Sequence, residues 1–170
     1  MSEPRPQAPE PTAVAAIARL LEAYAIEHVR HRHVAVATID EAQRLVPHLT
    51  VDLLKTVAFE ISGTSRVLLV AVRAEDQVDY RGVAAVAGCN RRALRLLPPA
   101  RVAAEFGFEV GGVGPFTVDP RIEVVLDAVA MALPRVKVGG GSRTITYELA
   151  SADLARLGAV VAGVSKRGAT

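Results

Sequence analysis

Apolar residues recur at steps of three and four along the first regular stretch of the chain, residues 13–25. This spacing is typical of an amphipathic helix with one buried stripe, and its apolar positions are Val14, Ile17, Leu20, Leu21 and Tyr24. Thr12 stands in front of the stretch as the predicted N-cap. Residues 1–11 hold four prolines and no apolar pattern, so we expect them to form a flexible tail.

Short strands and short helices alternate along the rest of the chain. Extended patterns cover residues 26–37, 51–61, 66–73, 93–97, 122–127, 133–138, 144–149 and 159–164. Helices are predicted for residues 39–46, 79–87 and 152–157. Thr38 and Glu41 spell a capping box before the first of these helices, Gly88 ends the second, and Ser151 is the predicted N-cap of the third. We expect a hairpin across residues 62–65. No repeat or linker interrupts the pattern, which predicts one mixed α/β domain over residues 12–166.

Composition narrows the class of protein. Of the 170 residues, 51% are hydrophobic and 22% charged, which supports a packed core and excludes wholesale disorder. A net charge of +2 excludes a polybasic nucleic-acid arm. The single cysteine, Cys89, excludes an internal disulfide and fits a reducing compartment. The sequence shows neither a secretory signal nor an apolar run of the ~18 residues that span a membrane, so we expect a cytoplasmic protein.

Lys55 is the most informative polar position, because it lies within a predicted strand. Alternation along residues 51–61 puts Lys55 on the more apolar face, with Leu53, Val57, Phe59 and Ile61. An unpaired ammonium there would cost several kcal/mol of desolvation, which an anionic ligand in a cleft would offset. The alternative is that the side chain extends to water at the edge of the sheet.

Two glycine-rich segments are the next candidates. Residues 111–116 read Gly-Gly-Val-Gly-Pro-Phe, and residues 139–143 read Gly-Gly-Gly-Ser-Arg. Glycines let a backbone approach a ligand closely and turn its N–H groups toward a developing oxyanion. Neither segment matches a dinucleotide or phosphate-loop fingerprint, and each is also consistent with an ordinary turn.

Other polar residues give weaker signals. His28, His31 and His33 cluster, yet no further ligand with zinc spacing follows. Cys89 has no signature that links it to a histidine, so we interpret it as a small core residue rather than a nucleophile. Four arginines either meet phosphates or form a solvated face: Arg91, Arg92, Arg95 and Arg101.

Several of these motifs occur in an order that belongs to a known family. Leu54-Lys55-Thr56 lies in a strand, residues 79–84 (DYRGVA) open a helix, and the loop 111–116 follows. A strand that ends at Asp127 comes next, then residues 139–143, Tyr147-Glu148-Leu149 and the helix at 151–154. In this ordered set the chain resembles the YbaK/EbsC family of aminoacyl-tRNA deacylases, which is similar to the editing insertion domain of bacterial prolyl-tRNA synthetases. The resemblance covers about residues 13–165.

The resemblance implies a mixed, barrel-like sheet flanked by short helices. It also implies hydrolysis of the ester between a small amino acid and the 3′ end of a mischarged tRNA, tRNA(Pro) or a related one. No cofactor or metal is implied; the partners are the tRNA 3′ end and an aminoacyl-tRNA synthetase. Lys55 would hold the terminal phosphate or carbonyl, and the loop from Gly111 to Pro115 would supply backbone donors around the aminoacyl carbonyl, with Gly111 and Gly112 assigned to catalysis. The remaining residues that the resemblance assigns to substrate binding are His31, Thr56, Val113, Gly114, Pro115, Gly139 and Ser142.

The sequence departs from the family pattern around the amino-acid pocket. Gly139 stands where Cys-specific members have a serine, His31 replaces a tyrosine near the first strand, and Gly114 replaces a residue with a hydroxyl. Ser142-Arg143-Thr144 replaces a Lys-Arg-Gly stretch. These differences bear on amino-acid specificity more than on the chemistry. They also keep open a non-catalytic module that binds tRNA or a synthetase, and a domain that binds a small molecule.

Overall fold

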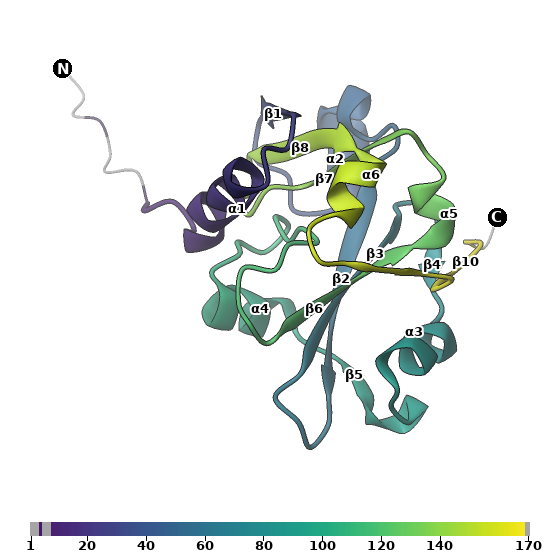
Figure 1. Ribbon diagram of the computed structural model, residues 1–170. Helices are drawn as coiled ribbons and strands as arrows, with labels where there is room; N and C mark the ends of the chain where they lie inside the picture. The colour runs from purple at the N-terminus through teal and green to yellow at the C-terminus, as the bar shows by residue number, and fades with distance from the viewer. Residues whose placement is uncertain (1–3, 5–7, 169–170) are drawn as a thin grey trace.

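A five-stranded mixed sheet forms the centre of the molecule. The computed structural model describes residue 4 and residues 8–168 (Figure 1). The sheet has the order β5 (Leu94–Leu96), β2 (Leu54–Ile61), β3 (Val67–Arg73), β6 (Ile122–Asp127) and β9 (Val160–Ala162). β5, β2 and β3 run antiparallel, while β3, β6 and β9 run parallel. The run VLLVAV of β3 is buried throughout, because both faces of the central strands are covered.

Two smaller sheets complete the strand structure. β1 (His28–Arg32), β8 (Ile145–Ala150) and β7 (Arg135–Gly139) form an antiparallel sheet in that order. β4 (Gln77–Val78) pairs with β10 (Ser165–Lys166). β7 approaches the start of β2 through a bridge between Leu53 and Lys137. The prediction of a single mixed α/β domain is confirmed, and its sheets stay separate rather than closing into a barrel.

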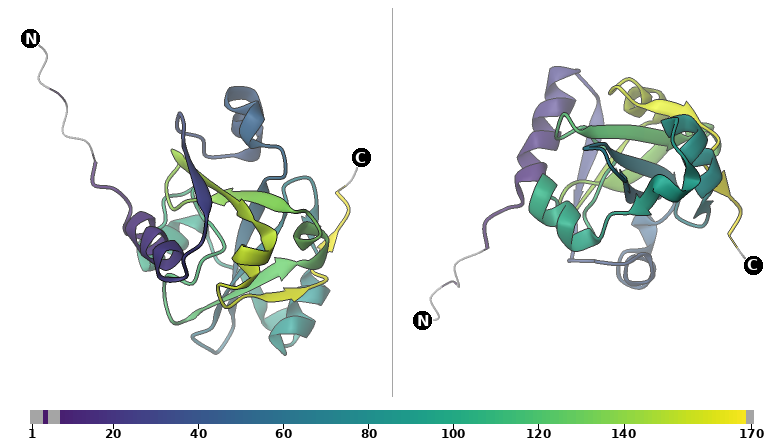
Figure 2. Two further views of the ribbon diagram at one scale, coloured as in Figure 1. Left: turned by 45° about the horizontal axis from the view of Figure 1, so that its top comes forward. Right: turned by 90° about the horizontal axis from the view of Figure 1, so that it is seen from below.

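Helices cover the two faces of the central sheet. α1 (Thr12–Ala23) and α4 (Pro99–Phe106) lie on the side of the three-stranded sheet, whereas α3 (Tyr80–Ala87) covers the opposite side (Figures 1 and 2). The short helices are α2 (Ile39–Leu45), α5 (Ala128–Met131) and α6 (Ser151–Ala155), with single 3₁₀ turns at Pro47–Leu49 and Arg91–Ala93. Within the described residues, none of the helices has the length and apolar character that crossing a membrane requires.

Two predicted helix caps are present as expected. The Thr38 hydroxyl accepts the Glu41 N–H at 3.1 Å, while the Glu41 carboxylate accepts the N–H of Ala37, one residue before the expected partner, at 2.8 Å. Gly88 ends α3 in the left-handed region at φ 66°, which glycine adopts without penalty.

Two other predicted caps are wrong because tertiary contacts move the helix start. α1 begins at Thr12 itself, and the carbonyl of Gly107 accepts the N–H of Ala13 at 3.1 Å. α6 begins at Ser151, whose N–H donates to Pro134. Tyr24 is also not part of the buried stripe, since it is 44% exposed. Sequence reasoning missed α4, although Pro99 at its start, Gly107 after its end and the pair Arg101–Glu105 are helix signals.

Asp127 ties the C-terminal segment to the central sheet. It is fully buried at the end of β6, and its carboxylate accepts the N–H of Ala130 at 3.2 Å, the N–H of Val164 at 3.0 Å and the hydroxyl of Ser165 at 2.8 Å. A buried carboxylate needs such donors to offset the loss of water. This carboxylate is therefore one of the contacts that position the segment leading into β10.

Replacing Asp127 by alanine should lower the free energy of unfolding by about 3 kcal/mol, because buried donors lose their acceptor. Asp153→Ala is the matched control: it removes an exposed pair with Arg156 and should cost less than about 1 kcal/mol. Urea unfolding followed by circular dichroism measures both. Equal losses in the two variants would contradict the role given to Asp127.

Candidate active site

Two neighbouring cavities meet at Lys55. The first, here called the apolar cavity, has a volume of about 330 Å³ and lies between the segment 33–56, the loop at 110–113 and the segment 139–146. Its walls include Val36, Ile39, Ala42, Val46, Leu49, Leu54, Val113 and Ile145. The second, here called the basic cleft, has a volume of about 570 Å³ and lies toward β4, α3 and β10. Lys55 lines both.

Strand β2 explains why Lys55 reaches this position. Leu54 and Ala58 pack into the core beneath the three-stranded sheet, while Val57 and Phe59 pack into the core beneath α3. Lys55 lies near the start of β2, opposite Val72 of β3, and it is half-buried. It forms no ion pair with any carboxylate in the described part of the chain. Its ammonium is therefore available to an anionic ligand.

The two glycine-rich segments lie against each other and form one wall of the apolar cavity. A Cβ on Gly114 would lie 1.9 Å from the carbonyl oxygen of Gly139, and one on Gly112 would lie 2.6 Å from the backbone of Ser142. Gly111 has φ +89°, and a Cβ there would lie 2.6 Å from the Cα of Ala37. Side chains at these positions would push the segments apart.

Backbone hydrogen bonds decide which N–H groups of the loop are available. The N–H of Gly112 donates to the carbonyl of Glu109 at 2.8 Å, and the carbonyl of Gly112 accepts the N–H of Gly141 at 2.8 Å. Gly112 is therefore not a donor to a substrate, contrary to the expectation from sequence. The N–H groups of Gly111 and Val113 find no acceptor among the described residues, and both residues line the cavity.

Arg143 holds the loop from the opposite segment. Its Nε donates to the carbonyl of Val110 at 2.6 Å and lies 3.4 Å from the carboxylate of Glu109. Ser142, which also lines the cavity, shares a hydrogen bond of 2.9 Å with the hydroxyl of Thr144. The contacts of Arg143 with Val110 and Glu109 explain how an arginine in a glycine-rich segment stabilises this wall of the cavity.

The structure brings together six of the ten residues that the sequence assigned to the site. Those that line the apolar cavity are Lys55, Thr56, Gly111, Val113, Gly139 and Ser142. Gly112, Gly114 and Pro115 lie in the same loop without lining the cavity. His31 also lies outside its walls: it sits on β1, with Nε2 3.9 Å from the carboxylate of Glu148.

His33 lines the cavity in place of His31. Its Nε2 shares a hydrogen bond of 2.9 Å with the hydroxyl of Thr146, which lines the cavity too. The extended pattern predicted over residues 26–37 would put His31 and His33 on one strand face, but β1 ends at Arg32. The chain turns there, so alternation does not extend to His33.

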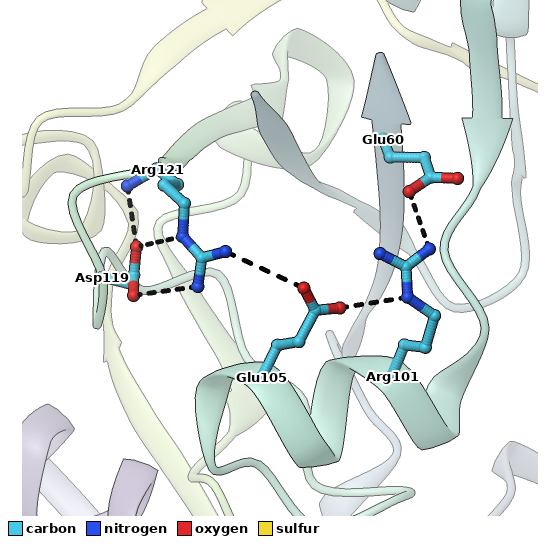
Figure 3. A network of polar contacts seen from close by, with 5 residues as sticks. All are labelled: Glu60, Arg101, Glu105, Asp119 and Arg121. Atoms are coloured by element: carbon cyan, nitrogen blue, oxygen red, sulfur yellow. Dashed lines mark hydrogen bonds and ion pairs between the residues drawn. The ribbon is translucent and has the colours of Figure 1, made fainter. Parts of the chain in front are cut away.

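A network of ion pairs closes the base of the long loop that carries Gly111 (Figure 3). Glu105 of α4, before the loop, lies 3.8 Å from the guanidinium of Arg121, after it. Arg101 of α4 pairs with Glu105 at 3.1 Å and with Glu60 of β2 at 2.8 Å. The Arg121 guanidinium also stacks over the Phe106 ring, 4.8 Å from its centroid. The end of the loop is thus paired with α4, the helix from which the loop starts, and α4 is in turn paired with β2.

Arg121 also changes the acidity of a neighbouring carboxyl. Hydrogen bonds from its side chain and its backbone N–H lower the pKa of Asp119 below the ordinary value. A carboxyl with a lowered pKa in the folded state stabilises the fold above its unfolded pKa, and this contribution disappears as the pH falls through the folded pKa.

Arg121→Ala should therefore raise the pKa of Asp119 toward its ordinary value and lower stability more at pH 7 than at pH 3. Carbon-13 titration of the side-chain carboxyl by NMR and urea unfolding at the two pH values measure these effects. Arg66→Ala is the control, since Arg66 lowers the pKa of Glu123 instead. An Asp119 titration that is the same with and without Arg121 would contradict this assignment.

Comparisons with known proteins bear on the family and the fold of the chain. Residues 33–157 match the model of the aminoacyl-tRNA editing domain. The fold is similar to the crystal structure of the hypothetical protein APE2540, with a TM-score of 0.77 and 24% identity over 89% of this chain and 99% of that one. It is also similar to a putative trans-editing enzyme for prolyl tRNA synthetase, with a TM-score of 0.71 and 22% identity over 91% and 98% of the two chains. Because the family model matches more than half of the residues of this chain, the chain belongs to the YbaK-like aminoacyl-tRNA editing domain family.

Proposed function

We propose that the protein is a trans-editing deacylase that hydrolyses the ester of a small amino acid on a mischarged tRNA, tRNA(Pro) or a related one. One observation carries the proposal beyond the family: Lys55, Gly111 and Val113 line the same cavity, and the N–H groups of the two loop residues have no acceptor among the described residues. A cation and two backbone donors around one space are the groups that an anionic RNA end and an ester carbonyl require.

The geometry supports a simple division of roles. The ester carbonyl oxygen accepts hydrogen bonds from Gly111 and Val113, and Lys55 holds the phosphate of the terminal nucleotide. Water adds to the carbonyl carbon, and the negative charge that develops on the oxygen is stabilised by the two N–H groups. The bond to the ribose oxygen then breaks and that oxygen takes up a proton, which releases the amino acid and the uncharged tRNA. We assign the activation of the water to a hydroxyl of the substrate's terminal ribose.

The walls of the apolar cavity bear on specificity. The described residues that line it include no aspartate or glutamate, and most are aliphatic. A volume of about 330 Å³ is at the lower end of ligand pockets. Both properties favour a small aminoacyl side chain without a positive charge. Editing of a synthetase error would place the reaction in the cytoplasm, with a synthetase as the supplier of the tRNA.

Lys55→Met should reduce kcat/KM for ester hydrolysis at least about a hundredfold, the size of effect seen when one charge-stabilising group is removed from an active site. The measurement is release of radiolabelled amino acid from a panel of mischarged tRNAs. Lys55→Arg keeps the charge and should keep part of the activity. If wild type releases no amino acid from any member while still binding uncharged tRNA, the non-catalytic binding module is supported instead.

Gly111→Ala should reduce the same activity at least about tenfold, since the new Cβ displaces the loop from Ala37 and moves the two N–H donors. Gly63→Ala is a matched control, because Gly63 also has positive φ, +78°, but no atom within 4 Å of the added Cβ. Both variants pay the left-handed backbone penalty of about 1 kcal/mol. Equal activity in the two variants would argue against a role for the Gly111 backbone.

A further inference from the structure

The basic cleft on the other side of Lys55 gathers positive charge in a protein whose total charge is nearly balanced. The nine residues that line it come from β2, β4, α3, the 3₁₀ turn at Arg91 and β10: Lys55, Val57, Gln77, Val78, Asp79, Tyr80, Arg81, Arg91 and Lys166. Four of the nine are cations, and Asp79 is the single carboxylate. Asp79 accepts the backbone N–H of Arg81 at 3.2 Å as the N-cap of α3.

The four cations differ from most others in lacking acidic partners. Nine lysines and arginines form ion pairs with carboxylates elsewhere in the described chain. No such pair involves Lys55, Arg81, Arg91 or Lys166 in that part of the chain. Like charges around one cavity repel each other, and a bound polyanion removes this repulsion. The cleft therefore has the electrostatics of a phosphate-binding site.

Arg91 is held in place by an aromatic ring rather than by an acid. Its guanidinium lies over the ring of Tyr80, 4.5 Å from the centroid, and Tyr80 packs edge-on against the buried ring of Phe59 at 5.1 Å. Stacking fixes the plane of the guanidinium and leaves its N–H donors free. Such a donor set suits the oxygens of a phosphodiester.

Lys166 reaches the cleft from a part of the chain that the family match does not include. The match ends at residue 157, whereas Lys166 lies on β10, paired with Gln77. Three contacts hold this segment: the carboxylate of Asp127, a hydrogen bond of 2.7 Å from the N–H of Asp79 to the carbonyl of Val164, and the close approach of Gly163 to Gly82. The ammonium is thus delivered by an ordered strand.

We propose that the C-terminal strand completes a binding site for the sugar–phosphate backbone of single-stranded RNA, in which Arg81, Arg91 and Lys166 contact phosphates. Because Lys55 lines both cavities, the nucleotides that precede the aminoacylated end occupy the basic cleft while the ester lies in the apolar cavity. The identification of the ligand as a tRNA 3′ end rests on the proposed function.

The test is binding of a fluorescent RNA hairpin that ends in a single-stranded 3′ CCA, without an amino acid, to the full chain. Arg91→Ala and Lys166→Ala should each raise Kd about fivefold at moderate salt and reduce the salt-dependence slope by about 0.7. Arg92→Ala is the matched control: Arg92 is an exposed neighbour on the same turn, without an ion pair in the described chain, and it does not line the cleft. Its Kd should change less than about twofold.

A second hairpin that lacks the overhang separates the single-stranded end from the duplex. Arg91→Ala and Lys166→Ala should leave its binding unchanged; an equal loss for both hairpins would overturn the assignment to single-stranded RNA. If Arg91→Ala and Lys166→Ala bind the hairpin with the overhang as tightly as Arg92→Ala does, the proposed site is wrong. Thermal melting confirms that each variant is folded. Hydrolysis by the wild-type protein is measured separately on the panel of mischarged tRNAs. If the wild type hydrolyses the ester while the two variants bind the hairpin normally, only the inference about the basic cleft fails. If the variants bind weakly while the wild type hydrolyses no member of the panel, only the deacylase function is refuted.

Discussion

The contact between two glycine-rich segments determines the shape of the apolar cavity. Gly112 and Gly114 lie so close to the backbone of residues 139–142 that no side chain fits between them. This approach lets the carbonyl of Gly112 accept a hydrogen bond from Gly141, which locks the loop in one conformation. The N–H groups of Gly111 and Val113, which have no acceptor among the described residues, belong to this wall. Backbone dipoles that are held in place in this way are preorganised, which is the condition under which they stabilise a developing charge effectively.

Charge is the second property that the tertiary structure organises. Acidic and basic residues nearly cancel along the sequence, and nine of the lysines and arginines among the described residues form ion pairs, as in the network around Glu105. That network anchors the long loop, while four cations without such a pair line the cleft at Lys55. One set of basic residues therefore pairs with carboxylates of the fold, and the set around the cleft has no such partner among the described residues. Net charge alone conceals this division, because the two sets differ only in their neighbours.

The C-terminal segment connects these two properties. Asp127 is buried at the end of a core strand and binds backbone and side-chain donors of residues 164 and 165. Its position is set by the hydrophobic packing of β6, since the strand is buried on both faces. The packing of the core thereby fixes where Lys166 stands, although that residue is itself exposed. The carboxylate that stabilises the core therefore also helps to position Lys166, which the proposed RNA site would use.

The sequence by itself determined the class of fold, most of the strands and the two segments that carry the site. Local signals sufficed for these, because period-two patterns, the capping box at Thr38 and the glycine at 88 act over a few residues. Alternation along β2 also put Lys55 on the face of Val57, and both residues line the basic cleft. Only the tertiary structure decided that Gly112 is already bonded, that His33 rather than His31 lines the apolar cavity, and that Lys166 lines the same cleft as Arg91. These outcomes depend on contacts between residues far apart in the chain, and neither the local pattern of side chains nor their spacing encodes which backbone groups such contacts leave unpaired.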